Sequence, residues 1–390
     1  MARHTLKPGW QVWRFEQMAQ NVQDRIDRPV ESGLERFVGL EHLDSGSLKI
    51  WRWGSTADVE QTKLLFKQGD IIFGRRNAYL RRVAVADFAG VCSAHAMVLR
   101  AKPDVVLPAF LPFFMQTDMF WEAALKVSAG SMSPTINWPN IAQEEFALPP
   151  MEEQRRIADI LGGVEESLES LDDLESKTAA VRKSYLVDAF SRIIHEPQTR
   201  TVKITDVGEV LMGRQRSPKY DRGISPRPYL RVANVFDGYI DTTDVKVMDF
   251  SEIEFEEYRL IPGDVLLVEG HSSAEVVGRS SIYRDEVSNC CFQNTLIRFR
   301  PKKVSPEYSH YYFQYCLYTG RFSVVAKQTT IAHLGRNRFA SMEFLLADAK
   351  VEQQIVDELT SIESSLQSII RRKATIEQLK RLILEIVLPH

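Results

Sequence analysis

The chain contains Ile157-Ala-Asp-Ile-Leu-Gly-Gly-Val-Glu-Glu-Ser-Leu-Glu-Ser-Leu171 and repeats it later as Ile355-Val-Asp-Glu-Leu-Thr-Ser-Ile-Glu-Ser-Ser-Leu-Gln-Ser-Ile369. The two copies lie 198 residues apart, and seven of their fifteen positions are identical. Each copy follows a Glu-Gln pair, Glu153-Gln154 and Glu352-Gln353. The sequence therefore predicts a pseudo-twofold chain in which a globular domain and a long helix each occur twice.

Both copies carry apolar residues at alternating spacings of four and three, which is the pattern of a heptad seam. The predicted helix-pair seam consists of Ile157, Leu161, Val164, Leu168, Leu171, Ile355, Leu359, Ile362, Leu366 and Ile369. The helices are expected over residues 151–195 and 349–390, each about 60 Å long. Pro149-Pro150 sets the start of the first helix, and Asp348 is a candidate N-cap of the second. Such a stripe should pack on the other helix, on a partner, or on both.

Gly162-Gly163 interrupts the first copy, and each glycine costs about 1 kcal/mol relative to alanine inside a helix. Two explanations remain open. The pair allows a close approach or a kink at a partner surface, or the continuous helix starts only after Gly163.

Composition limits the class of protein. The 390 residues, 44% of them hydrophobic, are enough for two or three cores. No apolar run reaches the ~18 residues of a membrane span, and no secretory signal is visible. The four cysteines lack the spacing of a metal site, which favours reduced thiols in a cytoplasmic protein. The net charge of −3 argues against a general polyanion binder.

The segments 1–150 and 196–348 are predicted to be α+β domains. Strand-like runs occur at 37–40, 70–73, 83–85, 97–99, 229–232, 264–268, 281–283 and 295–299, and helical patches at 14–24, 111–126 and 308–318. Phe66-Lys-Gln-Gly-Asp-Ile-Ile72 matches Leu260-Ile-Pro-Gly-Asp-Val-Leu266, a Gly-Asp turn that leads into a buried strand. This turn explains Asp264 better than a catalytic role does. The chain lacks a phosphate-binding loop, an adenine methyltransferase signature, a zinc pattern and a nucleophile elbow, so we expect no catalysis and no bound cofactor or metal.

Basic residues interleaved with polar and aromatic ones point instead to nucleic acid. Gly74-Arg-Arg-Asn-Ala-Tyr-Leu-Arg-Arg82 directly follows a predicted strand. Arginine pairs with guanine or phosphate, and asparagine with adenine. Further candidates come from the loops 128–137, 213–220, 269–275 and 328–338. The predicted DNA-binding residues are Arg75, Arg76, Asn77, Tyr79, Arg81, Arg82, Ser131, Asn137, Arg214, Arg216, Lys219, Tyr220, His271, Ser272, Ser273, Thr329, Thr330, His333, Arg336, Asn337 and Arg338. A solvated surface loop is the alternative for each cluster.

Taken together, these features resemble the specificity (S) subunit of type I restriction–modification systems. The resemblance rests on Gly69-Asp-Ile-Ile-Phe-Gly-Arg-Arg-Asn-Ala-Tyr-Leu80, on the Leu148-Pro-Pro-x-x-Glu-Gln-x-x-Ile157 lead-in and on the two helical repeats, and it covers nearly the whole chain. One departure is the second lead-in, residues 346–353, which lacks the prolines. The angle at which the second helix leaves its domain is therefore open.

The resemblance implies two target recognition domains, 1–150 and 196–348, each reading one half of a split DNA sequence. It also implies that the conserved helices, 151–195 and 349–390, pack antiparallel as a coiled-coil spacer and set the gap between the half-sites. The expected partners are double-stranded DNA, two methyltransferase (M) subunits that use S-adenosylmethionine, and restriction/translocase (R) subunits. The chain itself would be non-catalytic.

Two other classes predict different behaviour. A coiled-coil scaffold that binds only proteins would show no salt-sensitive binding to duplex DNA. A fused methyltransferase or nuclease would turn over substrate as an isolated chain. The near-neutral charge of the globular segments predicts weak DNA binding by the chain alone.

Overall fold

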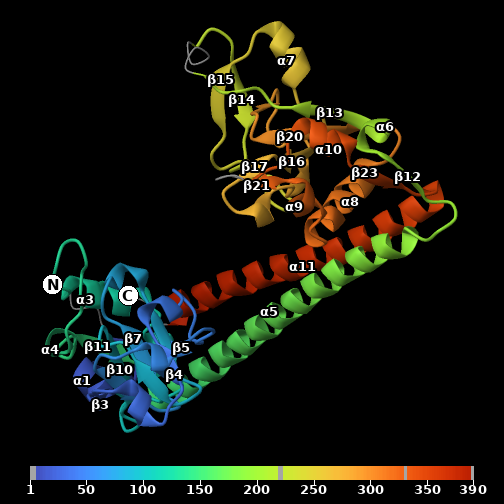
Figure 1. Ribbon diagram of the computed structural model, residues 1–390. Helices are drawn as coiled ribbons and strands as arrows, with labels where there is room; N and C mark the ends of the chain where they lie inside the picture. The colour runs from blue at the N-terminus through green and yellow to red at the C-terminus, as the bar shows by residue number, and fades with distance from the viewer. Residues whose placement is uncertain (1–5, 218–222, 329–331, 388–390) are drawn as a thin grey trace. The chain divides into compact units, whose positions relative to one another are not determined.

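The computed structural model describes residues 6–217, 223–328 and 332–387. The chain forms two compact units, one from Met1–Asp173 with Ile370–His390 and one from Leu174–Ile369, here called unit 1 and unit 2. Each unit mixes helices and sheets, so the α+β prediction is confirmed (Figure 1). Among the described residues, no helix is both long and apolar enough to cross a membrane.

Unit 1 contains a central sheet of order β2-β10-β7-β8, a second sheet of order β3-β6-β9-β4-β5, and the pair β1-β11. The strands are β1 (Gln11–Arg14), β2 (Ala19–Val22), β3 (Arg25–Ile26), β4 (Arg36–Val38), β5 (Gly54–Ser55), β6 (Lys63–Phe66), β7 (Ile71–Gly74), β8 (Val83–Val85), β9 (Gly90–Cys92), β10 (Ala96–Ala101) and β11 (Glu145–Leu148). The short helices are α1 (Phe15–Met18), η1 (Pro29–Ser32), η2 (Leu40–His42), η3 (Thr56–Asp58), η4 (Ala78–Leu80), α2 (Leu111–Phe114), α3 (Asp118–Lys126) and α4 (Trp138–Ile141).

Unit 2 repeats this plan with a central sheet of order β13-β20-β16-β18 and the pair β12-β23, and adds two three-stranded sheets, β15-β14-β19 and β17-β22-β21. The strands are β12 (Arg200–Lys203), β13 (Gly208–Met212), β14 (Pro226–Leu230), β15 (Lys246–Asp249), β16 (Val265–Val268), β17 (Gly270–His271), β18 (Ser280–Ile282), β19 (Cys291–Phe292), β20 (Leu296–Pro301), β21 (Lys327–Gln328), β22 (Ala332–His333) and β23 (Glu343–Leu346). The short helices are α6 (Ile204–Val207), α7 (Glu252–Tyr258), η6 (Ala274–Val276), α8 (Pro306–Tyr318), α9 (Arg321–Val325) and α10 (Arg336–Ser341).

The central strands are buried on both faces, which explains why they read as continuous apolar runs. In β7, Ile71 and Phe73 belong to one apolar cluster and Ile72 to another. In β16, Val265 and Leu267 likewise face one cluster and Leu266 and Val268 a second. Successive side chains of a strand point to opposite faces, so each strand joins two cores.

The Gly-Asp turn before each of these strands has the same backbone geometry and equivalent hydrogen-bond partners in both units. Gly69 and Gly263 have positive φ values of 87° and 94°, which side chains larger than hydrogen rarely adopt. The carboxylate of Asp70 accepts hydrogen bonds from the Lys67 amide at 2.9 Å and from Arg100 at 2.7 and 2.9 Å. Asp264 does the same with the Ile261 amide and Arg300. The expectation that Asp264 belongs to a structural turn is met by this geometry.

One local prediction is wrong. The segment 14–24, expected to be helical, forms the single-turn helix α1 and then the strand β2. Pairing with β10 overrides the helical pattern, because Val22, Asn21, Gln20 and Ala19 lie opposite residues 98–101 of that strand. The predicted helix at 111–126 is present but broken between Phe114 and Asp118, where Thr117 caps α3.

The long helices are α5 (Met151–Ile193) and α11 (Ala349–Val387), the long green and red ribbons of Figure 1. Asp348 caps α11 as predicted, since its carboxylate accepts a hydrogen bond from the Lys350 amide at 2.9 Å. Helix α5 runs through Gly162 and Gly163 without a break, so the explanation that it starts after Gly163 is wrong. A methyl group at either glycine would meet no atom within 4 Å, so no described segment makes a close approach there.

The Glu-Gln pairs that precede the two repeats are not structurally equivalent. The side chain of Gln154 is buried and accepts a hydrogen bond from the Leu107 amide at 2.9 Å. In the second copy this role falls to Glu352, which accepts a hydrogen bond from the Ser305 amide at 2.8 Å, whereas Gln353 is exposed. Gln154 and Glu352 are 198 residues apart, so the helical repeat extends backwards with the same offset and the Glu-Gln match is shifted by one residue.

The helices run antiparallel within each unit. In unit 1, Asp172 pairs with Lys373, and Glu165 pairs with Lys380 at 2.5 Å, so a step of seven residues down one helix matches seven residues up the other. In unit 2, Arg182 of α5 donates to Glu363 of α11 at 2.9 Å.

All ten residues of the predicted seam are buried or half-buried. Ile157 and Leu161 are buried in the main apolar cluster of unit 1, and Ile355 and Leu359 in that of unit 2. Both clusters contain residues of the other long helix as well as of the globular core, namely Leu384 of α11 in unit 1 and Leu186 and Phe190 of α5 in unit 2. Leu171 is buried, and the others are half-buried, namely Val164, Leu168, Ile362, Leu366 and Ile369.

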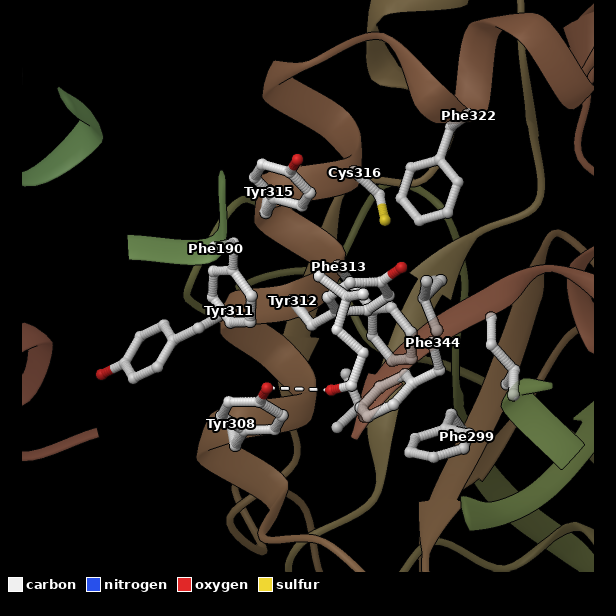
Figure 2. Packing of buried hydrophobic residues seen from close by; sticks show 14 of the residues in the cluster. Phe190, Phe299, Tyr308, Tyr311, Tyr312, Phe313, Tyr315, Cys316, Phe322 and Phe344 are labelled. Carbon is white, nitrogen blue, oxygen red and sulfur yellow. Dashed lines mark hydrogen bonds between the residues drawn. The ribbon is translucent and has the colours of Figure 1, made fainter. Parts of the chain in front are cut away.

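Helix α8 forms the aromatic centre of unit 2 (Figure 2). Tyr312 packs on Phe344 with ring centroids 4.5 Å apart, and Phe190 of α5 stacks on Tyr315. The Tyr308 hydroxyl donates to the Leu345 carbonyl at 2.8 Å. The ring of Tyr311 points away from the rings around Phe344, from the other side of α8.

His310 predicts how the stability of unit 2 depends on pH. It is buried on α8, its Nδ1 lies 3.1 Å from the Ser280 hydroxyl, and burial lowers its pKa to about 4. An unfolded histidine has a pKa of about 6.5, so the unfolded state binds more protons between these values. We expect the free energy of unfolding of unit 2 to be constant above pH 6.5 and to fall by up to about 3 kcal/mol as the pH drops to 4.

Urea unfolding measured from pH 7.5 to 4 checks this expectation. The variant His310→Gln, which keeps a partner for Ser280 but does not titrate, should lose most of the slope. An equal slope in both proteins would assign the pH dependence to other groups.

Candidate nucleic-acid interface

In unit 1 the predicted cluster 74–82 forms a closed loop at the end of β7. The Gly74 amide donates to the Arg82 carbonyl at 2.9 Å, which brings the two ends together. Asn77 and Arg81 flank η4 in the left-handed region, with φ values of 55° and 48°. Left-handed backbone is uncommon for residues other than glycine, so the loop has one defined shape that fixes where its side chains leave the backbone.

This loop lies against the second predicted cluster, 128–137. The Ile136 amide donates to the Arg75 carbonyl at 2.9 Å. Arg75 Nη2 donates to Asn137 Oδ1 at 3.0 Å, and Arg76 Nε donates to the Ser133 hydroxyl at 3.2 Å. The same hydroxyl donates to Asn77 Oδ1 at 2.7 Å. The clusters 74–82 and 128–137, which lie about 50 residues apart in the chain, therefore form one polar surface.

A hollow of about 850 Å³ opens beside this surface, with Arg75 and Asn137 in its wall. Its lining also includes polar residues that sequence reasoning missed, among them Asn21, Gln23, Arg25 and Lys63. Arg75 Nε and Asn21 Oδ1 are both buried without a hydrogen-bond partner. A buried donor and a buried acceptor left unpaired are costly, and a ligand with a mixed donor and acceptor edge would satisfy both.

Unit 2 builds the corresponding surface from β17, β22 and β21. The Leu334 amide donates to the Glu269 carbonyl at 2.8 Å, the same link that joins Ile136 to Arg75 in unit 1. The carboxylate of Glu269 accepts a hydrogen bond from the Gly335 amide at 3.1 Å and lies 2.9 Å from His333 Nδ1. Residues 269–271 and 332–335 of the two predicted loops thus meet as their counterparts in unit 1 do.

The two surfaces share a backbone frame but differ in charge. At matched positions after the central strand, unit 1 has Arg75 and unit 2 has Glu269. A cation and an anion at the same place select different hydrogen-bonding edges, because arginine only donates and a carboxylate only accepts.

The structure places most of the other predicted residues at or near the surface. Exposed residues are Arg76, Tyr79, Arg81, Ser131, Arg216, Ser272, Ser273, His333, Arg336 and Asn337, and half-buried ones are Arg75, Asn77, Arg82, Asn137, His271 and Arg338. Arg81 is paired with Asp118, and Arg338 Nη2 donates to the His333 carbonyl at 2.7 Å. Lys219, Tyr220, Thr329 and Thr330 lie outside the described residues.

Arg214 does not lie at the surface, contrary to its prediction as a DNA-binding residue. It is 6% exposed, pairs with Glu254 at 2.6 Å and lies over the ring of Phe250 at 4.7 Å. The basic run 213–220 predicts a surface arginine, but the ring of Phe250 and the Glu254 carboxylate of α7 hold Arg214 inside unit 2. Its role is structural.

Among residues 6–217, 223–328 and 332–387, no group of three or more His, Cys, Asp or Glu side chains is arranged to hold a metal ion. The four cysteines are buried and unpaired, and burial raises the pKa of the Cys92 thiol to about 12.

Comparison with known proteins gives the family. The model of the type I restriction modification DNA specificity domain matches twice, over residues 35–176 and 198–378. The chain belongs to this family. The two matches fall on the two halves of the repeat, and each contains one of the polar surfaces described above.

Two curated relatives are specificity subunits of type I restriction enzymes. The EcoDI subunit of Escherichia coli is 27% identical over 150 residues, 38% of this chain and 33% of the relative. The EcoKI subunit of Escherichia coli strain K12 is 24% identical over 237 residues, 57% of this chain and 51% of the relative. The chain thus spans between a third and a half of the length of these relatives.

Among solved structures, a chain from a study of complex assembly and conformational transition in the type I R-M system has the same fold. Its TM-score is 0.61 at 19% identity, and the match covers 99% of both chains.

Proposed function

We propose that this chain is the DNA sequence-specificity subunit of a type I restriction–modification complex. Each unit reads one half of a bipartite, asymmetric target, while the α5–α11 pair sets the gap between the halves and docks methyltransferase subunits. The observation that carries the proposal is the twofold match of the DNA specificity domain to residues 35–176 and 198–378. A single chain with two such domains suits a target with two parts.

The chemistry of the two surfaces supports different readings of the two halves. Arg75, held by Asn137 beside a polar hollow, can present two donors to a guanine edge or to a phosphate. In unit 2, Glu269 and His333 occupy the matched surface, and a carboxylate accepts from cytosine. The readout would therefore be asymmetric although the scaffold is repeated.

The chain itself would make and break no bond. Two methyltransferase subunits would supply S-adenosylmethionine and the methyl transfer, and restriction/translocase subunits would join the same assembly. The place of action would be the cytoplasm, where the host DNA lies. Phosphate contacts from partner subunits would compensate for the near-neutral charge of this chain.

Co-expression tests this proposal. The chain and a type I methyltransferase subunit from the same host are expressed in cells without other adenine methylation, and the genome is sequenced for methylated adenines. We expect one motif with two specified halves and a gap of fixed length. Cells that express the methyltransferase subunit alone should show no such motif. A protein-binding scaffold would add no motif and no salt-sensitive duplex binding.

Arg75 and Arg76 give a prediction at the level of single residues. In the complex, Arg75→Ala should cost about 1–3 kcal/mol of discrimination at one position of one half-site, because this guanidinium borders the hollow. Competition binding with duplexes that carry single base changes measures the effect. Arg76→Ala should weaken all sequences alike if it contacts phosphate.

Arg28→Ala is the matched control, since Arg28 is an exposed arginine of unit 1 that pairs only locally, with Glu31. It should leave discrimination and affinity unchanged. If Arg75→Ala weakens every duplex equally, Arg75 contacts the DNA backbone and reads no base.

A further inference from the structure

Two buried cations lie between the long helices, one in each unit. Arg182 of α5 is 8% exposed and Lys380 of α11 is 7% exposed. They are 198 residues apart, the offset of the helical repeat, although both lie beyond the repeated segment itself. Buried lysine and arginine are rare unless they are paired, so both positions need an explanation.

In unit 2 the partners of Arg182 come from two other helices. Its Nε donates to Glu363 of α11 at 2.9 Å, and its Nη2 donates to Gln314 of α8 at 2.6 Å. Glu363 also accepts a hydrogen bond from Tyr311 at 3.0 Å, the residue that points away from the aromatic core in Figure 2. One guanidinium therefore links α5, α11 and the globular part of unit 2.

Unit 1 contains the matching arrangement with the roles of the two helices exchanged. Lys380 of α11 pairs with Glu165 of α5 at 2.5 Å and donates to the Gly46 carbonyl at 3.2 Å. Gln116 donates to the same carbonyl at 2.8 Å. Glu165 and Gln116 precede Glu363 and Gln314 by the same 198 residues. The cation, the glutamate and the glutamine are thus a repeated set.

A buried ion pair adds little net stability, because its attraction roughly offsets the cost of removing both charges from water. Its best-attested effect is to select one pairing over others. A heptad stripe alone would allow α11 to shift along α5 by seven residues, because apolar residues of the two helices would again lie opposite each other. Such a slip in unit 2 would place Val356 or Ile370 opposite Arg182 in place of Glu363, and the buried charge would lose its partner.

We propose that these buried pairs set the register of α5 on α11 and connect that register to each globular part through Gln314 and Gln116. Arg182 and Lys380 are then positioning residues for target selection: they fix the length of the gap between half-sites without touching DNA. This inference rests on the proposed function, because a gap exists only if the target is bipartite.

The test compares gap selectivity among variants of the full complex. The double variant Arg182→Met with Glu363→Met replaces the pair by apolar side chains of similar length. Methylation is measured on duplexes in which the two half-sites are separated by the native gap or by gaps one to three base pairs longer or shorter. We expect methylation at non-native gaps to rise at least tenfold relative to the native gap. The charge-exchanged variant Arg182→Glu with Glu363→Arg should restore much of the selectivity.

The pair Asp172 and Lys373 provides the control, because it also joins the two helices but is about one-third exposed. Replacing both residues by methionine should leave the gap unchanged. If the double variant at 182 and 363 does not fold, Arg182→Lys keeps the charge but loses one of the two links and should broaden the gap less. An unchanged gap in a folded variant that has methionine at both pairs, Arg182–Glu363 and Lys380–Glu165, overturns the inference. Failure of the wild-type complex to methylate any bipartite motif overturns the proposed function instead.

Discussion

Replacing Asp264 by alanine is expected to lower the free energy of unfolding of unit 2 by about 3 kcal/mol. The carboxylate is fully buried, accepts two hydrogen bonds from Arg300 at 2.7 and 2.8 Å, and accepts a third from the Ile261 amide at 2.9 Å. Alanine would leave the guanidinium, whose side chain is 20% exposed, without its charge partner. It would also remove the bond that holds the Gly-Asp turn before β16.

The repeated scaffold offers an internal comparison. Asp70→Ala removes the same bonds in unit 1, but the side chain of Arg100 is 42% exposed, so water solvates it better once it is unpaired. We expect a smaller loss for Asp70→Ala, about 2 kcal/mol, measured by urea unfolding with a separate probe for each unit. Asp188→Ala, on an exposed face of α5, should change stability by less than about 0.5 kcal/mol. Equal losses at Asp70 and Asp264 would contradict the role assigned to arginine burial.

Local chemistry explains which parts of the fold could be predicted from the sequence. The eight strand-like runs overlap β4, β7, β8, β10, β14, β16, β18 and β20, because apolar runs bounded by turns signal buried strands directly. The helix prediction for segment 14–24 is wrong because the conformation of this segment depends on pairing with β10, some 80 residues later in the chain. Non-local pairing of this kind leaves no periodic signal in the segment itself.

The candidate interface could be predicted only as separate clusters. The arginines at 75 and 76 follow a strand, which is a local signal. The contact of this loop with residues 128–137 is instead made by backbone and side-chain hydrogen bonds between residues that are far apart in the chain. The other polar residues that line the hollow, such as Asn21 and Lys63, come from β2 and β6. Isolated polar residues on strands have no motif, so sequence reasoning could not single them out.

The buried cations were missed for a related reason. Arg182 and Lys380 look like solvated charges on the polar face of a helix, and only burial distinguishes them. The signal was nevertheless present. The offset of 198 residues, applied beyond the repeated segment, places a cation on a cation and a glutamine on a glutamine. Burying a charge costs free energy, so a repeat that keeps a buried cation at both positions indicates that the cation has a structural role there.

Lengthening the helix pair by one heptad is expected to abolish recognition of the native target. A copy of residues 166–172 is inserted after Asp172, and a copy of residues 373–379 before Lys373, so that the pairs Asp172–Lys373 and Glu165–Lys380 keep their own spacing. Seven residues add about 10 Å of helix and nearly two full turns, so the apolar stripe stays on one face. Ten ångströms correspond to about three base pairs of duplex, which also rotate the far half-site by roughly 100°.

The two units can then no longer contact both half-sites of the native target at the same time. We therefore expect methylation at the native gap to fall at least tenfold and the remaining activity to move to longer gaps. The control is an insertion of seven polar residues between His195 and Thr199, in the segment that connects α5 to β12, which lengthens the chain but neither helix. This control should keep the native gap. If the heptad variant folds and still selects the native gap, the length of the helix pair does not set the distance between the half-sites. A helix pair that sets this distance would change the selected gap by about three base pairs when it is lengthened by about 10 Å.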